Sequence, residues 1–387
     1  MTSPLSAEVN DARRLLEAIG STHRFTGSEA ETSAREKCAA DLTEAGFEVS
    51  SHPFTFSEFP ARWAPPLGAG LTMVLVSVTA FLASKPGGSV IGLGIVAGGL
   101  AAIGWAAARV ARTGTSTIPW MRSASNNLVA TRGRHRRDAT SIWLVAHIDS
   151  KSQTIAMHVR IASVFASAMG IAGLFVGLVL GTFAQLAPSI SAIAAMAELS
   201  ADIVLVCFYV TLVSLLPLLV CLTGNKSDGS VDNASGVVAV LLAARRLDPL
   251  IPVGIVITSG EELALAGARA FVLSHAERGI ALNCDTIDDD GRFIAMTSGR
   301  RQPRLSAAMG KAAERVGTTV SVTRMLPGVL ADNVAFTDAG WESLTLSRGN
   351  LGTLARVHTS DDNLERFTGD AIVQASRLLA ATVEELT

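Results

Sequence analysis

The stretch VAHIDSKSQTIAMHVRIASVFASAMGIAGLFVGLVLG, residues 145–181, decides how this chain is organised. It begins like the end of a buried strand and places His147 and Asp149 two residues apart. It then becomes apolar enough to enter a membrane. A polar strand end and a candidate membrane segment therefore adjoin in one short piece of sequence.

Four apolar runs of this kind occur in the 387 residues, of which 49% are apolar and only 17% charged. Each run lacks charge over about the 20 residues that a bilayer core requires, and the runs are 63–84, 86–108, 161–197 and 203–225. We predict four transmembrane helices in two hairpins, which turn at the SKPGGS sequence and near Pro188. The alternative, buried helical hairpins of a soluble protein, is disfavoured because no run has a charged face.

Each hairpin returns the chain to the side from which it entered, so the soluble pieces can meet on one side of the membrane. The flanks on that side carry the basic residues Arg62, Arg109, Arg112, Arg160 and Lys226, whereas the far-side turns carry only Lys85 among these flanking charges. By the positive-inside rule we expect an integral protein of the plasma (inner) membrane whose soluble domain faces the cytoplasm.

Other features of the sequence exclude several classes of protein. The net charge of -2 gives no basic excess for binding nucleic acid, which we therefore do not expect as a partner. The four cysteines have no repeated spacing and do not predict a disulfide framework. The acidic, helix-patterned N-terminus does not resemble a cleaved secretory signal.

The rest of the chain alternates between helical and strand patterns. Two amphipathic helices are expected before residue 47, and a capping box formed by Ser28 and Glu31 opens the second. Strands are expected at 47–54, 126–133, 141–147, 252–260, 279–285 and 342–348, and helices at 233–247, 302–317 and from about 368. This alternation predicts a three-layer α/β/α sandwich with a mostly parallel mixed sheet. The domain is built from residues 1–62, 111–159 and 226–387, and the hairpins 63–110 and 160–225 interrupt it.

Candidate ligands follow several of the expected strands, at the sheet edge where open α/β folds bind their ligands. They are His147 and Asp149, the pair Glu261 and Glu262, and Asp285, to which the sequences SDGSVDNASG and RVHTSDDN add Asp232 and His358. Two histidines with several carboxylates suit zinc or a similar divalent ion. Each motif alone is as well explained by a turn, a helix cap or an exposed loop, so only their joint order indicates a metal site.

That order, AHIDS, DNASGV, GEELALAG, NCDTID, VLADNVAF and VHTSDDN, resembles the co-catalytic di-zinc exopeptidases, metallopeptidase family twenty-eight. The family includes zinc aminopeptidases and glutaminyl cyclases, and the resemblance covers nearly all of the soluble chain. It implies two zinc ions and a peptide substrate. It also implies the following roles: His147 and Asp285 bind one zinc, Glu262 and His358 bind the other, Asp232 bridges them, Glu261 is the general base and acid, and Asp149 orients His147. Asp332 matches a further acidic position whose role stays open.

Two departures from the family's pattern qualify this prediction. Many members have a tyrosine directly before the last histidine, but here that position is Val357, and the only tyrosine, Tyr209, lies in a predicted span. A whole helical hairpin also separates His147 from Asp232, which predicts an active site close to the cytoplasmic leaflet. The rival functions are acyl transfer with one zinc, as in glutaminyl cyclases, and a receptor or scaffold without activity. A transporter is disfavoured because the predicted spans carry no charge.

Overall fold

The computed structural model describes residues 4–113, 115–132, 142–186, 191–275, 277–299, 301–325 and 329–387. The chain divides into two compact units. The α/β unit comprises Met1–Pro60, Thr113–Ser152 and Gly224–Thr387, and the helical unit comprises Ala61–Arg112 and Gln153–Thr223. The helical unit is thus inserted into the α/β unit at two separate points of the sequence.

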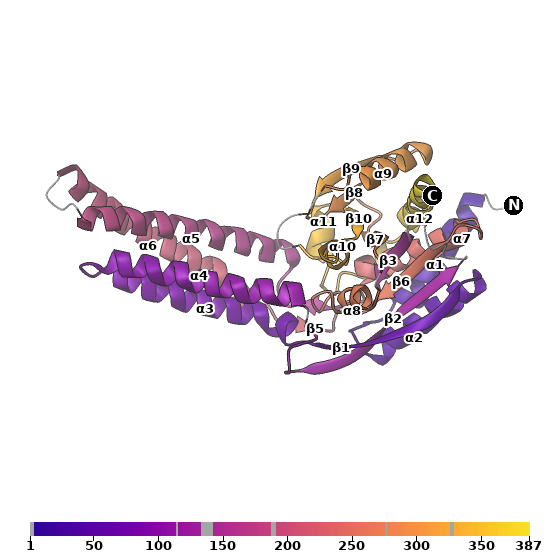
Figure 1. Ribbon diagram of the computed structural model, residues 1–387, viewed down its shortest axis with the longest axis horizontal. Coiled ribbons are helices and arrows are strands. Elements are labelled where there is room, and N and C mark those ends of the chain that lie inside the picture. The colour runs from indigo at the N-terminus through magenta and orange to yellow at the C-terminus, as the bar shows by residue number, and fades with distance from the viewer. Residues whose placement is uncertain are drawn as a thin grey trace. The chain divides into compact units, whose positions relative to one another are not determined.

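One eight-stranded sheet forms the centre of the described α/β unit (Figure 1). Its strands are β1 (Glu48–Ser57), β2 (Arg122–Arg132), β3 (Ile142–His147), β6 (Val253–Thr258), β7 (Ile280–Ile287), β8 (Arg292–Thr297), β9 (Val320–Arg324) and β10 (Glu342–Gly349). Their order is β1-β2-β6-β3-β7-β10-β8-β9. The central strands β6, β3, β7 and β10 run parallel, whereas β1, β2 and β8 each have antiparallel neighbours. The expected mostly parallel mixed sheet is confirmed.

Helices cover both faces of this sheet. They are α1 (Pro4–Gly20), α2 (Glu29–Glu44), α7 (Ser235–Arg246), α8 (Ala266–Ser274), α9 (Pro303–Arg315), α10 (Asn333–Asp338), α11 (Leu351–Arg356) and α12 (Asp370–Leu386). Strand β3 shows why both faces need cover: Ile142 and Leu144 lie in the core under α7, whereas Trp143 and Val145 lie in the core under α8 and α10. Because successive side chains of a strand point to opposite faces, a fully apolar strand requires a helix layer on each side.

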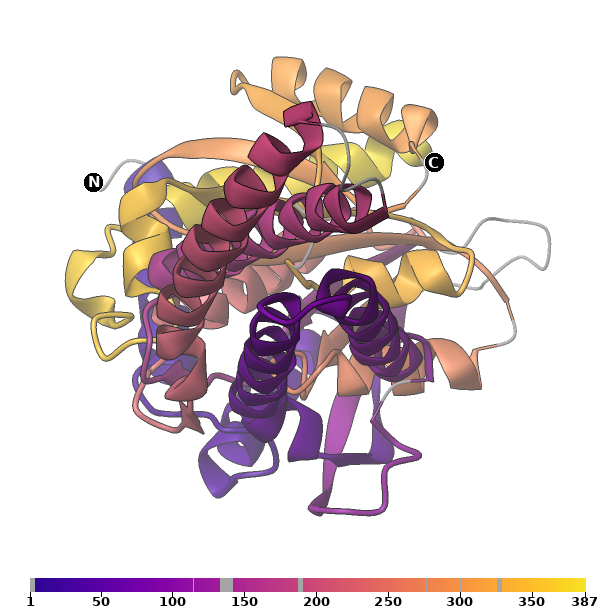
Figure 2. The same cartoon turned by 90° about the vertical axis from the view of Figure 1, so that its left-hand side faces the viewer.

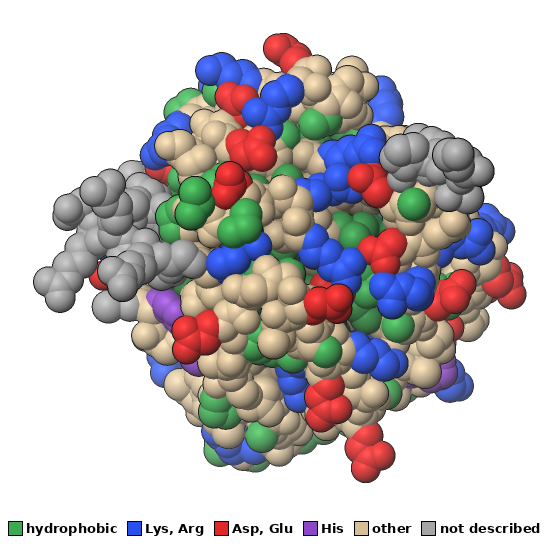
Figure 3. Space-filling model, turned by 90° about the vertical axis from the view of Figure 1, so that its right-hand side faces the viewer, with side chains coloured by type: hydrophobic (Ala, Val, Ile, Leu, Met, Phe, Trp, Pro, Cys, Tyr) green, Lys and Arg blue, Asp and Glu red, His purple; other side chains and the backbone are tan. Residues whose placement is uncertain are grey.

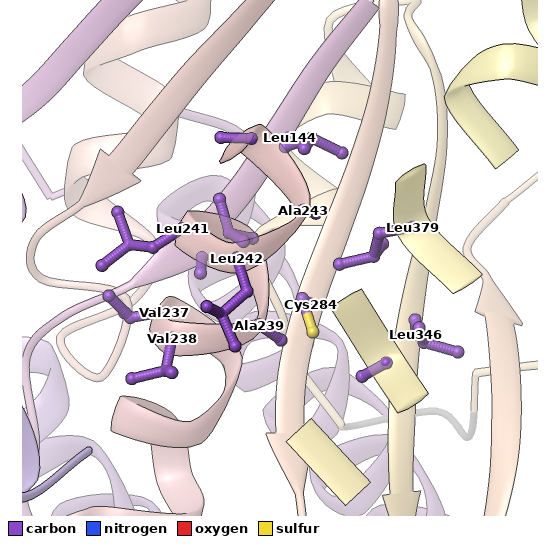
Figure 4. Packing of buried hydrophobic residues seen from close by; sticks show 14 of the residues in the cluster. Leu144, Val237, Val238, Ala239, Leu241, Leu242, Ala243, Cys284, Leu346 and Leu379 are labelled. Carbon is purple, nitrogen blue, oxygen red and sulfur yellow. The ribbon is translucent and has the colours of Figure 1, made fainter. Parts of the chain in front are cut away.

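The larger core cluster lies between α7, α12 and the central strands. Figure 4 shows Leu241 and Leu242 of α7 beside Leu144 of β3 and Cys284 of β7, with Leu379 of α12 in the same cluster. This packing fixes the strand ends that carry the candidate ligands. On the outer side of the α/β unit shown in Figure 3, acidic and basic side chains are interspersed.

The structure confirms most of the expected elements, and it adds elements that the pattern did not predict. Strand β1 extends to Ser57, and the ends of two predicted strands, Gly133 and Ser141, lie outside the described residues. Strands β8 and β9 and helices α8, α10 and α11 were not expected. Burial alternates along β8, and β9 is largely exposed, so neither shows the continuous apolar run of a central strand.

The helical unit contains four long helices: α3 (Phe59–Ala83), α4 (Gly88–Thr113), α5 (Met157–Leu186) and α6 (Ser191–Leu219). Figure 2 views them end-on, with α3 beside α4 and α5 beside α6. Each has a segment long and apolar enough to cross a membrane: Phe59–Ala83, Gly88–Val110, Met157–Leu186 and Met196–Leu219. The predicted turn near Pro188 lies outside the described residues. A two-stranded sheet of β4 (Ser152–Gln153) and β5 (Thr223–Gly224) joins the two ends of the second hairpin.

Helix α6 differs from the expectation of charge-free spans. The apolar run 161–197 is divided between α5 and α6, in agreement with the predicted turn near Pro188, but α6 continues from Ser191 through the exposed acids Glu198 and Asp202. From Asp202 to the end of α6 at Leu219 the helix is about 26 Å long at 1.5 Å per residue. This is close to the thickness of a bilayer core, about 30 Å, so a membrane span can place both acids at one boundary.

Small residues allow α5 and α6 to approach each other closely. A Cβ atom on Gly173 would lie 2.4 Å from Cys207 Sγ, and one on Gly177 would lie 2.8 Å from the Val204 side chain. Ser200 Oγ donates a hydrogen bond to the Gly177 carbonyl oxygen at 2.8 Å. Such contacts between small residues and a buried hydroxyl are typical of helix pairs in membranes.

Candidate active site

All seven predicted site residues lie at one edge of the α/β sheet. His147 is the last residue of β3, Glu261 and Glu262 follow β6, and Asp285 lies two residues before the end of β7 at Ile287. Because β6, β3 and β7 are parallel neighbours, their carboxyl ends meet at this edge. Loops bring the remaining residues there: Asp149 follows β3, Asp232 precedes α7 and His358 follows α11.

A first group consists of His147, Asp232 and Asp285. His147 Nε2 lies 3.1 Å from Asp232 Oδ1 and 3.6 Å from Asp285 Oδ1. All three side chains are buried. One ligand atom from each lies within 4.8 Å of the others, which is close enough to surround one metal ion.

A second group consists of Asp232, Glu262 and His358. His358 Nε2 lies 3.2 Å from Asp232 Oδ2 and 2.9 Å from Glu262 Oε1, and this group meets the same condition for an ion. The two oxygens of Asp232 therefore face different groups, Oδ1 the first and Oδ2 the second. Such an arrangement lets one carboxylate bridge two ions.

Several nitrogen and oxygen atoms at this edge are suited to bind a metal ion and do not form hydrogen bonds with one another. Among the described residues, the buried atoms His147 Nε2 and Glu262 Oε1 form no hydrogen bond, although carboxylates or a histidine are near. The Nδ1 atom of His147 lies 3.1 Å from the Asp149 carbonyl oxygen. A hydrogen bond there places the proton on Nδ1 and leaves the Nε2 lone pair to bind a metal.

Charge and burial together shift the pKa values of this cluster. Burial raises the pKa of Asp232, but its contacts with His147 and His358 lower that pKa well below the ordinary range. Burial and the neighbouring Glu262 and Asp285 carboxylates raise the pKa of Glu261 well above the ordinary range, against the opposing effect of His147. The site thus holds one carboxyl group that favours ionisation strongly and another that readily holds a proton.

Asp149 contacts more of the site than the prediction assigned to it. Its Oδ1 lies 3.6 Å from His147 Nδ1, which is longer than a hydrogen bond. Its carboxylate instead accepts hydrogen bonds from the backbone N–H groups of Glu261 at 3.2 Å and Glu262 at 3.3 Å, and from Thr26 Oγ1 at 2.9 Å. Asp149 therefore holds the loop that carries the Glu pair.

Two further side chains hold this loop: Asn127, which the sequence analysis did not single out, and Glu31, which it assigned only to a helix cap. Asn127 Oδ1 accepts a hydrogen bond from Ser259 N at 3.1 Å, and Asn127 Nδ2 donates one to the Gly267 carbonyl oxygen at 2.8 Å. The buried Glu31 accepts a hydrogen bond from the Ser259 hydroxyl. Both ends of the segment that contains Glu261 and Glu262 are thereby fixed.

Asp362 and Arg24 hold the segment that carries Asp232. The sequence analysis did not single out either residue. Asp362 accepts hydrogen bonds from Val231 N at 2.6 Å and Asp232 N at 3.3 Å, and burial raises its pKa to about 7. The fully buried Arg24 donates to the carbonyl oxygens of Ile148 at 2.8 Å and Gly229 at 2.9 Å. Arg24 thus links the loop after β3 to the loop before Asp232. The only sequence signals were an arginine before a capping box and an acidic pair after His358.

Asp332, whose role the sequence left open, is fully buried beside the Thr258 hydroxyl at the end of β6. Burial raises its pKa to about 7. The position before His358 is occupied by the buried aliphatic residue Val357, and Tyr209 lies in α6. A basic residue that the sequence did not single out, Lys151, lies beside Glu262, with its Nζ 2.7 Å from Glu262 Oε2.

Comparison with known proteins agrees with this site. Residues 214–383 match the description "Peptidase family M28". No curated protein matches the sequence significantly. The fold resembles an aminopeptidase from Aneurinibacillus sp. strain AM-1 (TM-score 0.56, 13% identity, 97% of this chain and 93% of that chain covered). It also resembles the zinc aminopeptidase BSAP from Bacillus subtilis (0.56, 13%, 97% and 95%).

A glutaminyl cyclase from Fimbriiglobus ruber has the same fold, with a TM-score of 0.53 and 14% identity over 100% of this chain and 97% of that chain. At these identities the solved structures establish the fold alone. The chain resembles peptidase family M28, whose model it matches over residues 214–383.

Proposed function

We propose that this chain is a membrane-anchored di-zinc metallo-exopeptidase, an aminopeptidase that removes N-terminal residues from short peptides. One observation carries the proposal: Asp232 directs its two oxygens to two separate groups of buried ligands, and Glu261 lies beside His147 of the first group. Glu261 Oε2 is 3.9 Å from His147 Nε2, and Glu261 adjoins Glu262 in sequence. The family and the zinc aminopeptidase neighbours support the same function.

In this proposal His147, Asp232 and Asp285 would hold one zinc ion, and Asp232, Glu262 and His358 would hold the other. Bound zinc would lower the pKa of a water molecule and polarise the scissile carbonyl group. The protein supplies fixed ligands, a buried setting and second contacts that orient the ligands, such as the bond from His147 Nδ1 to the Asp149 carbonyl oxygen.

Glu261 moves the protons in the proposed reaction. Its carboxylate accepts the proton of the attacking water, and its carboxyl then donates that proton to the nitrogen of the leaving amine. Burial raises the pKa of Glu261 above its ordinary value, which strengthens its carboxylate as a base for the proton of water. Asp149 holds the Glu261 backbone in place for this exchange.

The experiment that tests the proposal is a screen of aminoacyl and dipeptide substrates with the full chain purified in detergent. We expect hydrolysis by the wild-type chain and a loss of at least about 100-fold in kcat for Glu261→Gln with zinc retained. Glu314→Gln, an exposed change on α9, is the matched control and keeps full activity. Full activity in Glu261→Gln refutes the assigned role of Glu261.

The second candidate is acyl transfer without water, because a glutaminyl cyclase shares the fold. Such an enzyme works with one zinc ion, whereas the bridging geometry of Asp232 favours two. Zinc content per chain and cyclisation of an N-terminal glutaminyl peptide separate the two reactions. Absence of both zinc and turnover favours a receptor or scaffold.

We further propose that the segments 63–110 and 160–225 anchor the enzyme as two membrane hairpins, with the peptidase domain in the cytoplasm. The four long apolar helices support the anchor, and the arginines at the flanks support the orientation. A cysteine in place of Lys85, in a cysteine-free chain, is expected to react with an impermeant thiol reagent added outside the cell. Replacing residues 160–223 by a short polar loop tests whether the second hairpin also affects substrate choice. Unchanged peptide selectivity supports mere anchoring.

A further inference from the structure

Lys151 lies beside one of the two ligand groups. It follows Asp149 by two residues in the loop after β3, and its side chain is only 14% exposed. Its Nζ atom lies 2.7 Å from Glu262 Oε2 and 3.2 Å from the Glu262 carbonyl oxygen. The loop that begins with the first-group ligand His147 thus carries a cation that reaches a ligand of the second group.

The contacts of Glu262 divide its two oxygens between different partners. Oε2 pairs with Lys151, whereas Oε1 lies 2.9 Å from His358 Nε2 and faces the second group. A carboxylate held in this way offers a metal ion one oxygen instead of two. The Lys151 ammonium group also neutralises part of the negative charge of the Glu262 carboxylate. This carboxylate would therefore compensate less of the positive charge of a metal ion.

The first group has a different electrostatic setting. The carboxylates of Asp149, Asp232, Glu261 and Asp285 surround His147, at 3.1 to 3.9 Å from its ring nitrogens. The carboxylates of Asp232 and Glu262 lie beside His358, and the Lys151 ammonium group pairs with the second of them. Acidic groups therefore dominate around His147, and a cation partly offsets them around His358.

We propose that Lys151 makes the two metal positions unequal, by limiting Glu262 to one oxygen and by placing a positive charge beside the ion held by Asp232, Glu262 and His358. This inference rests on the proposed function. Both effects weaken metal binding at the second position, so this position is the weaker of the two. An ion at this position would be less neutralised by its ligands and would polarise a carbonyl group more strongly, which matters in a chain with Val357 in place of a tyrosine.

The proposal makes a signed prediction: removal of Lys151 tightens zinc binding. Lys151→Met removes the charge and releases Glu262 Oε2, so the weaker zinc is expected to bind about 10-fold more tightly, within the range that contacts behind metal ligands usually produce. Lys151→Arg keeps the charge and the pairing and retains the wild-type affinity. Lys151→Gln keeps a hydrogen-bond donor for Glu262 but no charge, so its affinity lies between those of wild type and Lys151→Met.

The experiment is competition between the detergent-purified full chain and a chromophoric zinc chelator, after all metal has been removed. Asp285→Asn weakens the first group and isolates the second, so Lys151→Met in that background shows which position tightens. Lys311→Met, an exposed change on α9, is the matched control. Steady-state kinetics give a second readout, in which Lys151→Met lowers kcat with little change in KM and Lys151→Arg restores it.

The outcomes separate this inference from the function on which it rests. Two bound zinc ions with unchanged or weaker affinity in Lys151→Met overturn the role of Lys151 and leave the di-zinc site intact. Failure of the wild-type chain to bind zinc overturns the proposed function as well. Tighter binding in Lys151→Met, intermediate binding in Lys151→Gln and wild-type binding in Lys151→Arg together support the proposal. If Lys151→Met does not fold, Lys151→Gln decides alone, because unchanged or weaker binding in it also overturns the proposal.

Discussion

Asp149 is expected to hold the loop that carries Glu261 and Glu262, chiefly by accepting hydrogen bonds from its backbone amides. Replacement of Asp149 tests this role directly. Its carboxylate accepts the N–H groups of Glu261 and Glu262 and the hydroxyl of Thr26, all in a buried setting. Asp149→Ala leaves the buried amides of Glu261 and Glu262 without an acceptor. The Thr26 hydroxyl is not counted with them, since it can rotate to another partner. Each such amide costs about 1–3 kcal/mol, so the loop loses about 2–6 kcal/mol of stabilisation.

Hydrogen–deuterium exchange measures this loss at the residues concerned. At about 1.4 kcal/mol per tenfold change, the amides of Glu261 and Glu262 are each expected to exchange about 5- to 150-fold faster in Asp149→Ala. Asp149→Asn keeps one oxygen and has a smaller effect. Thr26→Val is the matched control, since it removes the hydroxyl and leaves both amide acceptors in place. Unchanged exchange at both amides in Asp149→Ala would refute the idea that Asp149 holds this loop.

Three further predictions follow from the buried polar contacts. Burial raises the pKa of Glu31 to about 7, above the ordinary 4.5. Between these two pH values the folded state binds more protons than the unfolded state. The free energy of unfolding therefore falls by up to about 3 kcal/mol as the pH rises from about 4.5 to about 7. Melting curves at pH 5 and pH 8 should therefore differ less for Glu31→Gln than for wild type, and an equal difference contradicts the assignment. Metal removal by a chelator is expected to lower the melting temperature by several degrees, because a ligand at 1,000 times its Kd contributes about 4 kcal/mol, and readdition of zinc should restore it. Asp362→Asn removes one of the two carboxylate oxygens that accept hydrogen bonds from the amides of Val231 and Asp232. We expect zinc to bind about 10-fold more weakly to this variant in a competition assay. Wild-type affinity would contradict this prediction.

The central strands could be predicted from the sequence because they are buried on both faces. In β3, β6 and β7 this burial produces short continuous apolar runs that end in polar residues. The edge strand β9 has no such apolar run in its sequence, since most of its residues are exposed. A turn near Pro188 could be predicted from the length of the apolar run, but the first residue of α6, Ser191, could not, because the sequence is apolar on both sides of that turn.

The candidate ligands were predictable because strand ends bring them together, and one family resemblance orders them along the chain. The residues that hold those ligands were not. Asp362 contacts Val231 across 131 positions of sequence, and Arg24 contacts Gly229 across 205. Lys151 adjoins a recognised motif, but its contact with Glu262 depends on how two loops meet. Such contacts arise from tertiary packing, and no local spacing encodes them.

The zinc content of the full chain, measured by elemental analysis after purification in detergent, tests the central claim most directly. The bridging geometry of Asp232 predicts two zinc ions per chain in the wild type and in Glu261→Gln. A chain saturated with zinc that holds one ion or none would contradict the account of this edge of the sheet as a two-metal centre.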